Sequence, residues 1–186
     1  MRNLFMMLFC ALLSTGCASD LKPMTIKLNS NFDQKEAHKL LEEGNNSIHG
    51  KAHIMQQDGS IVTCAGNPVK LIPATAYAQE RISYLYGWEV DKFIPVYRDL
   101  TKIAKSVAFV PDAPAYQEFL KVTVCNPQGY FSFSQLADGE FYVHTAVMLG
   151  NEESSKGLVM IQRVKVSGGE TQEIALTPTR RPPSIK

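Results

Sequence analysis

The sequence lacks any apolar run long enough to cross a bilayer as a helix. Its longest apolar stretch, residues 4–13, would extend only about 15 Å as a helix, half of the hydrocarbon core. Arg2 precedes this stretch and small residues follow it, an order typical of a secretory signal peptide. We therefore expect residues 1–16 to be a signal peptide that is absent from the mature chain.

The sequence also has little net charge. It contains 19 basic and 18 acidic residues, for a formal net charge of +1. Loss of Arg2 with the signal peptide would leave the two signs balanced. Since proteins that bind nucleic acid carry a basic footprint, we expect no nucleic-acid partner.

Recognisable catalytic and metal-binding motifs are missing. The chain has no His-x-x-Glu pair, no Gly-x-Ser-x-Gly and no phosphate loop. His49 and His53 lie on an expected strand, about 13 Å apart by strand rise, which is too far for one metal ion. The sequence therefore predicts no catalytic residue, no metal and no cofactor, with a site assembled from scattered residues as the alternative.

Cysteine is scarce, with four residues in the chain. Cys10 would leave with the signal peptide, and Cys17 lies in "LLSTGCAS". This stretch resembles the lipobox of bacterial lipoproteins, although Ser14 stands where leucine is more common. The resemblance implies that Cys17 becomes the lipidated N-terminus, and an ordinary signal peptide is the alternative.

Lipidation of Cys17 would make the membrane a partner of this protein. Several acyl chains anchor a protein stably, whereas one chain is marginal. Ala18 and Ser19, rather than aspartate, follow the cysteine, which by resemblance implies the outer membrane with the domain facing the periplasm. The inner membrane and the cell surface are the other locations. Residues 17–30 are expected to form a polar tether.

Cys64 and Cys125 remain in the mature chain, in what would be an oxidising compartment. Two cysteines in such a compartment usually pair. We expect a disulfide that closes a loop of roughly 60 residues. Two free thiols or half of a metal site are the alternatives.

Residues 31–177 are expected to form one domain. Asp33 can cap a short helix over about residues 33–43. Alternation from residue 48 to 54 predicts a half-buried strand with His49, Lys51 and His53 outside. Residues 76–105 are expected to form a helical insertion, and residues 178–186 a flexible tail.

Several short strands follow the insertion. Residues 117–149 predict three of them, separated by turns, and the segments after residue 157 predict a closing hairpin. The residues expected to point inward are Leu120, Val122, Val124, Phe131, Phe133, Phe141, Val143 and Val147. This pattern predicts a mainly β fold, an antiparallel sandwich with a short N-terminal helix and a helical insertion.

The stretch "NPQGYFSFSQLADGEFYVHTAV" resembles the carboxypeptidase regulatory-like domain. The matching residues are Gly129, Phe131, Phe133, Leu136, Gly139 and Tyr142. The resemblance covers roughly residues 47–75 and 117–176, and the helical insertion departs from it. It implies an Ig-like, transthyretin-like β-sandwich.

Aromatic residues concentrate in the insertion at Tyr84, Tyr86, Trp88 and Phe93. Such residues dominate binding hot spots, so they are candidates for a partner-binding surface. The alternative is that they pack the insertion against the sandwich. The sequence does not separate the two.

Together these patterns predict a lipid-anchored envelope protein whose sandwich is a non-catalytic structural or protein-docking module. An envelope protein would then be its partner. The alternatives are a module that binds carbohydrate or peptidoglycan and a lipoprotein of a secretion or conjugation apparatus.

Overall fold

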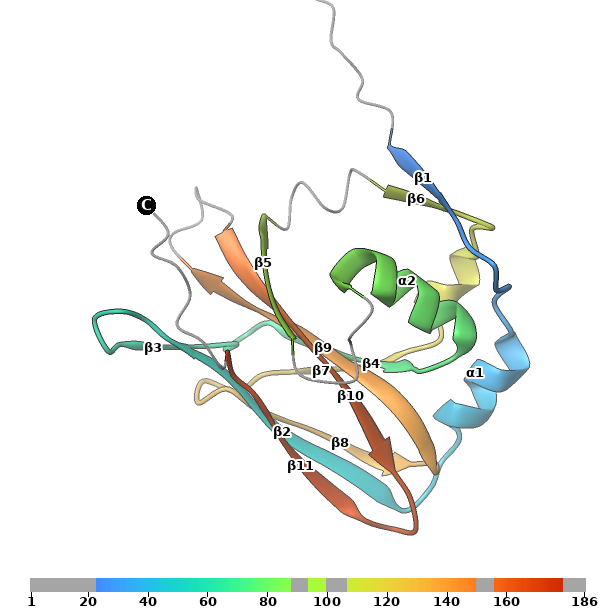
Figure 1. The fold of residues 1–186 in the computed structure, drawn as a ribbon. Helices are drawn as coiled ribbons and strands as arrows, with labels where there is room; N and C mark the ends of the chain where they lie inside the picture. The colour runs from blue at the N-terminus through green and yellow to red at the C-terminus, as the bar shows by residue number, and fades with distance from the viewer. Residues whose placement is uncertain (1–22, 88–93, 100–106, 150–155, 179–186) are drawn as a thin grey trace, which may run out of the picture.

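The computed structural model describes residues 23–87, 94–99, 107–149 and 156–178, and these form the helices and strands drawn in Figure 1. In chain order they are β1 (Met24–Lys27), α1 (Gln34–Leu41), β2 (Asn46–Met55), β3 (Ile61–Thr63), β4 (Pro68–Pro73), α2 (Ala76–Tyr86), β5 (Ile94–Asp99), β6 (Val107–Val110), the 3-10 helix η1 (Pro114–Gln117), β7 (Lys121–Val124), β8 (Tyr130–Leu136), β9 (Gly139–Leu149), β10 (Lys156–Val166) and β11 (Thr171–Leu176).

Two sheets pack face to face, which confirms the expected mainly β sandwich. The first has the order β5-β10-β9-β4-β7, with every pairing antiparallel. In the second, β2 pairs with β8 and β3 in antiparallel fashion and with β11 in parallel. The core between them is apolar, and its fully buried members include Ile48, Ile54, Leu71, Leu136, Phe141, Val143, Leu158 and Met160. Burying this surface is the main force that holds the sheets together.

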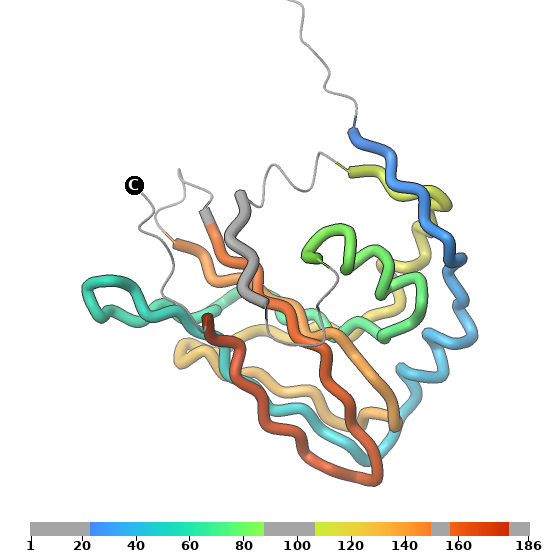
Figure 2. Tube along the Cα trace, in the orientation of Figure 1, coloured from blue at the N-terminus to red at the C-terminus, as the bar shows by residue number. Residues whose placement is uncertain are grey.

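A third layer covers the outer face of the five-stranded sheet. Figure 1 shows α2 lying over β4 and β9, with the β1 and β6 pair beyond it, and Figure 2 shows the N-terminal segment running beside β6. A second apolar cluster fills this layer, formed by Leu28, Ile72, Tyr77, Ala78, Ile82, Phe109, Tyr116, Tyr142 and Ile161. The middle strands β4, β9 and β10 therefore carry buried side chains on both faces.

Arg81 of α2 lies inside this second cluster. Its guanidinium carbon is 4.2 Å from the centre of the Phe109 ring and 4.9 Å from that of Tyr116. Its Nη1 donates a hydrogen bond to the Tyr77 hydroxyl at 3.0 Å and lies 3.7 Å from Asp112. The side chain is only 15% exposed. The charge is thus held by ring faces and one carboxylate, and it fastens α2 to the β6 segment.

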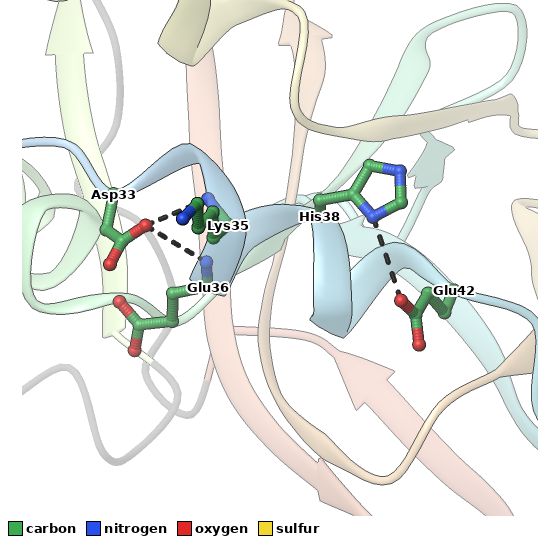
Figure 3. A network of polar contacts seen from close by, with 5 residues as sticks. All are labelled: Asp33, Lys35, Glu36, His38 and Glu42. Atoms are coloured by element: carbon green, nitrogen blue, oxygen red, sulfur yellow. Dashed lines mark hydrogen bonds and ion pairs between the residues drawn. The ribbon is translucent and has the colours of Figure 1, made fainter.

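The expected cap of the first helix is confirmed. Asp33 is the N-cap of α1, and its Oδ1 accepts hydrogen bonds from the backbone N–H groups of Lys35 and Glu36 at 2.8 and 3.2 Å (Figure 3). His38 and Glu42 form an exposed pair one turn later, 3.8 Å apart. The cap satisfies N–H groups that a helix start leaves unpaired.

The predicted inward positions are confirmed on β8 and β9 but wrong on β7. Val122 and Val124 are 54% and 58% exposed, whereas Cys125 is 3% exposed. The disulfide requires Cys125 to face the core, and since side chains alternate along a strand, the two valines must face outward. Leu120 is partly buried, against the second cluster rather than between the sheets.

The expected closing hairpin is also wrong. β10 and β11 belong to different sheets, and β11 pairs in parallel with β2. Asn46, 1% exposed, fixes this crossing because its Oδ1 accepts from the backbone N–H groups of Gly169 and Glu170 at 2.8 and 3.0 Å. Its Nδ2 donates to the Asp138 carboxylate at 2.9 Å. One buried amide thus ties two turns to the start of β2.

Two further expectations are corrected, one at the edge of the first sheet and one in the third layer. Residues 94–99, expected to be helical, form β5 because the edge of β10 offers backbone partners that outweigh the weak helical spacing. Residues 24–27, expected in the tether, form β1, which pairs with β6. Leu28 is then buried, and the Asn29 N–H donates to Glu80 at 2.7 Å. The N-terminal segment is therefore part of the fold from residue 24 onward.

Among the described residues, no helix has both the length and the apolarity needed to cross a membrane.

Candidate functional site

No described segment covers the outer face of the second sheet, whereas the third layer covers most of the outer face of the first. Along β2, Ile48, Ala52 and Ile54 are fully buried, so His49 and Lys51 point away from the core. The ladder places Glu173 of β11 and Ser132 of β8 on either side of His49, and Tyr130 of β8 beside Lys51. Two rows of side chains therefore cross this face, one of Glu173, His49 and Ser132 and one of Lys51 and Tyr130.

These rows border a groove with a volume of about 560 Å³. It is lined by His49, Gly50, Lys51, Thr123, Val124, Asn126, Tyr130, Phe131, Ser132, Glu173 and Ile174. Polar and apolar groups are mixed along it, and Val124 adds an exposed apolar wall from β7. A cavity of this size with a few placed polar groups is typical of a ligand site.

The polar rim of the groove contains an ion pair and a cation over a ring. His49 Nδ1 lies 3.2 Å from Glu173 Oε1, with the two side chains 51% and 75% exposed. The Lys51 ammonium lies 4.9 Å from the centre of the Tyr130 ring, which belongs to a residue 52% exposed. At such exposure these contacts add little stability, so they are available to a ligand.

A rigid turn positions Tyr130. The Asn126 side-chain oxygen accepts from the N–H groups of Gln128 and Tyr130 at 3.0 and 2.8 Å, and the Asn126 N–H donates to the Tyr130 carbonyl at 2.9 Å. Gly129 within it has a φ of +83°, which suits glycine. Cys125, immediately before the turn, is bonded to Cys64, with a Cα–Cα distance of 5.7 Å. The predicted disulfide is confirmed, and it fastens the turn that carries Tyr130.

The floor of the groove is closely packed at Gly50. A Cβ on this residue would lie 2.2 Å from the Phe131 ring, which is 5% exposed. Phe131 in turn packs edge-on against Phe133, with ring centres 6.3 Å apart. The ring occupies the space of the missing side chain, so the floor is fixed while the rim remains open.

His53, two residues beyond Lys51 on the same face, is not a partner of His49. Burial and the nearby positive charge of Lys51 lower the pKa of His53 below its ordinary value. Its Nδ1 is buried without a hydrogen bond among the described residues. Within the described ranges no group of three metal-ligating side chains occurs.

The order serine, histidine and glutamate across one row raises the possibility of nucleophilic catalysis. A catalytic triad needs a hydrogen bond between the hydroxyl and the base, and donors for a developing oxyanion. Among the described residues no hydrogen bond joins Ser132 to His49. The backbone of β2 at His49 is paired with β11 and β8, so its N–H groups are not available to an oxyanion. The row can donate and accept hydrogen bonds.

The aromatic candidates from the insertion lie elsewhere. Tyr84 is 43% exposed near the end of α2, and Tyr86 is half-buried, with its hydroxyl 3.1 Å from His144 Nε2. Trp88, Phe93 and the lipidation candidate Cys17 lie outside the described residues. Tyr86 thus packs the insertion against the sheet, and neither described tyrosine lines the groove.

His144 of β9 packs beneath α2, against the ring of Tyr86. Burial, together with the positive charge of Lys70 opposite it in the ladder, lowers its pKa to about 4. The imidazole is therefore neutral at pH 7 and can share one hydrogen bond with Tyr86.

The groove residues Lys51, Tyr130, Ser132 and Glu173 were not singled out from the sequence. Two of them could have been found: Lys51 from the outward positions of β2, and Tyr130 from the Asn-Pro-Gln-Gly turn before it. What was missing was the pairing, because alternation shows which residues share a face but not which strands are neighbours.

No protein-family model and no curated protein matches this chain. It is similar to a crystal structure described as a "putative carbohydrate binding protein" from Pseudomonas aeruginosa, with a TM-score of 0.57 and 19% identity, covering 80% of this chain and 99% of that one. A minor pilin of Streptococcus agalactiae matches with a TM-score of 0.34 and 11% identity, covering 75% of this chain and 48% of that one. The first of these likenesses confirms the β-sandwich fold.

Proposed function

We propose that this chain is a lipid-anchored envelope protein whose β-sandwich is a non-catalytic binding module, and that the groove on the β2, β8 and β11 face is its binding site. The observation that carries the proposal is the groove itself. It combines an exposed tyrosine, a lysine and a histidine-glutamate pair over a floor that is closely packed. A rigid floor with an exposed rim of polar and apolar groups favours binding, because little conformational entropy is lost when the ligand binds.

The location is part of the same proposal. The apolar stretch before Cys17 favours export and lipidation, and the Cys64–Cys125 disulfide fits an oxidising compartment. The absence of aspartate after Cys17 favours the outer membrane, facing the periplasm. The resemblance to the carboxypeptidase regulatory-like domain fits a binding rather than a catalytic role.

The anchoring is tested with Cys17→Ser. Membranes from cells fed an alkyne fatty acid should yield labelled wild-type protein, and the variant should be unlabelled. Ser19→Ala, two residues away, is the matched control and should label normally. Unlabelled wild-type protein, or labelled Cys17→Ser, would contradict lipidation at this residue.

The binding face is tested by hydroxyl-radical footprinting of the full chain. Tyr130 and Tyr84 are both exposed and oxidisable, but only Tyr130 lines the groove. Addition of solubilised envelope material should protect Tyr130 and leave Tyr84 unchanged. If both tyrosines react equally with and without the envelope fraction, the groove is not the binding site.

The non-catalytic assignment has its own test. Hydrolysis of p-nitrophenyl acetate by the wild type should equal hydrolysis by Ser132→Ala and by His49→Gln. A turnover that both substitutions abolish would show that the Glu173, His49 and Ser132 row is catalytic.

Protein docking is a second candidate, favoured by the edge strand β7. It ends the first sheet and exposes Val122 and Val124. An extended segment of another protein can add to such an edge and bury these side chains. Val122→Lys would then abolish the docking while leaving the protection of Tyr130 intact.

A further inference from the structure

Tyr130 is a fixed aromatic platform rather than a loop side chain. Its N–H and carbonyl are both held by Asn126, and its ring is flanked by the Lys51 ammonium. Half of the residue remains exposed in the groove. A tyrosine with its backbone so constrained offers a large contact area at low entropic cost.

The neighbouring row supplies groups that suit hydroxyl-rich ligands. His49 and Lys51 are two residues apart on β2, so the two rows are about 7 Å apart. Glu173 accepts hydrogen bonds, Ser132 both donates and accepts, and His49 lies between them in the ladder. A ligand on Tyr130 can therefore extend over acceptors and donors without leaving the sheet face.

We infer that the groove binds an oligosaccharide, with one sugar ring stacked on Tyr130 and the next over the row of Glu173, His49 and Ser132. This inference rests on the proposed function. The C–H face of a pyranose is weakly positive and apolar, and it complements the negative face of an aromatic ring. The hydroxyl groups at the rim of the same ring match the mixed donors and acceptors beside it.

The charge of Lys51 bears on which saccharides bind. Within the described part of the chain no carboxylate lies at ion-pair distance from its ammonium. It is thus available to a sugar carboxylate, as found in uronic acids, and equally to the oxygens of a neutral sugar. Both kinds of ligand share the stacking on Tyr130, and the two are separated by experiment.

The test is calorimetric titration of the full chain, in detergent, with tetra-N-acetylchitotetraose and with tetragalacturonate. Tyr130→Ala should weaken binding of the preferred probe about tenfold or more, and Tyr130→Phe should change it less than about threefold, because the ring is retained. Tyr84→Ala is the matched control and should bind as the wild type does.

Lys51→Gln tests whether the bound saccharide is acidic or neutral. If the substitution weakens the binding of tetragalacturonate alone, the saccharide is acidic. If the wild type and the variant both bind the two probes with similar affinity, it is neutral. If wild-type protein binds neither probe, or if Tyr130→Ala binds as well as wild type, the inference fails. Protection of Tyr130 by envelope material in the footprinting experiment would then still support the groove as a binding site, so the two failures are distinguishable.

Discussion

The two outer faces of the sandwich both place a cation over a tyrosine ring, but in opposite surroundings. On the first sheet's face, Arg81 is 15% exposed among Tyr77, Phe109 and Tyr116. On the second, Lys51 lies over Tyr130, which is 52% exposed. The covered contact fastens α2 to the β6 segment, whereas the exposed one lies at the groove that we propose binds a ligand. The two contacts have similar chemistry, so burial distinguishes the structural contact from the one that we propose binds a ligand.

The largest loss of stability is expected from a substitution of Tyr77, on the covered face. Tyr77 is fully buried, contacts the rings of Phe32 and Tyr116, and donates a hydrogen bond to the Pro111 carbonyl at 3.0 Å. Tyr77→Ala should lower the free energy of unfolding by about 4 kcal/mol, because it leaves a cavity in the third layer. Urea denaturation followed by circular dichroism measures this.

Tyr77→Phe is the control for the same site. It keeps the ring and loses only the hydroxyl bonds to Pro111 and Arg81. We expect a loss of about 1 kcal/mol. Equal effects of the two substitutions would mean that the hydroxyl, and not the packing, holds α2 in place.

A variant without the disulfide tests how much this bond stabilises the fold and the turn that carries Tyr130. Replacing Cys64 and Cys125 together with alanine should lower the free energy of unfolding by about 3 kcal/mol. Without the disulfide, the unfolded chain regains the conformational freedom that closure of a long loop removes. The turn that carries Tyr130 should also become more mobile. Denaturation of the oxidised wild type and the double variant gives the first effect, and amide exchange at Tyr130 gives the second.

A double variant as stable as the wild type would contradict the first expectation. Unchanged exchange at Tyr130 would show that the Asn126 hydrogen bonds position the tyrosine without help from the disulfide.

The covered face should also respond to pH through His144. Its pKa is about 4 in the folded protein and near 6.5 in the unfolded chain, so between these values the unfolded state binds a proton that the folded state does not. Stability is therefore lost as the pH falls from 6.5 to 4, by at most about 1.4 kcal/mol per pH unit.

Thermal or urea unfolding of wild type and His144→Gln at pH 7, 5.5 and 4.5 measures this contribution. The substitution keeps a polar group that can bond to the Tyr86 hydroxyl. The wild type should lose more stability than the variant over this range. Parallel curves would show that His144 is protonated as readily in the folded protein as in the unfolded one.

The smallest effect on stability is expected at Tyr130. Tyr130→Ala removes an exposed ring and its contact with Lys51, and it should change the free energy of unfolding by less than about 0.5 kcal/mol. Together with the Tyr77→Ala result, this would place structure on one face and function on the other. A loss of 2 kcal/mol or more in urea denaturation would make Tyr130 a packing residue and remove the contrast.

The sequence by itself determined much of the local structure. Alternation identified the inward residues Ile48, Ala52 and Ile54 of β2, and Asp33 marked the start of α1. The cysteine content and its expected compartment predicted the disulfide between Cys64 and Cys125. These features depend on neighbours in the chain or on cysteine chemistry, so they can be inferred without knowing the fold.

Only the tertiary structure decided which strands are neighbours. It turned Val122 and Val124 outward, moved β11 from a hairpin with β10 to a parallel position beside β2, and made residues 94–99 a strand. The groove depends on the second of these choices, because Glu173 meets His49 only through the β2–β11 pairing. Periodicity gives the face of a residue, whereas the packing of distant segments selects what that face meets.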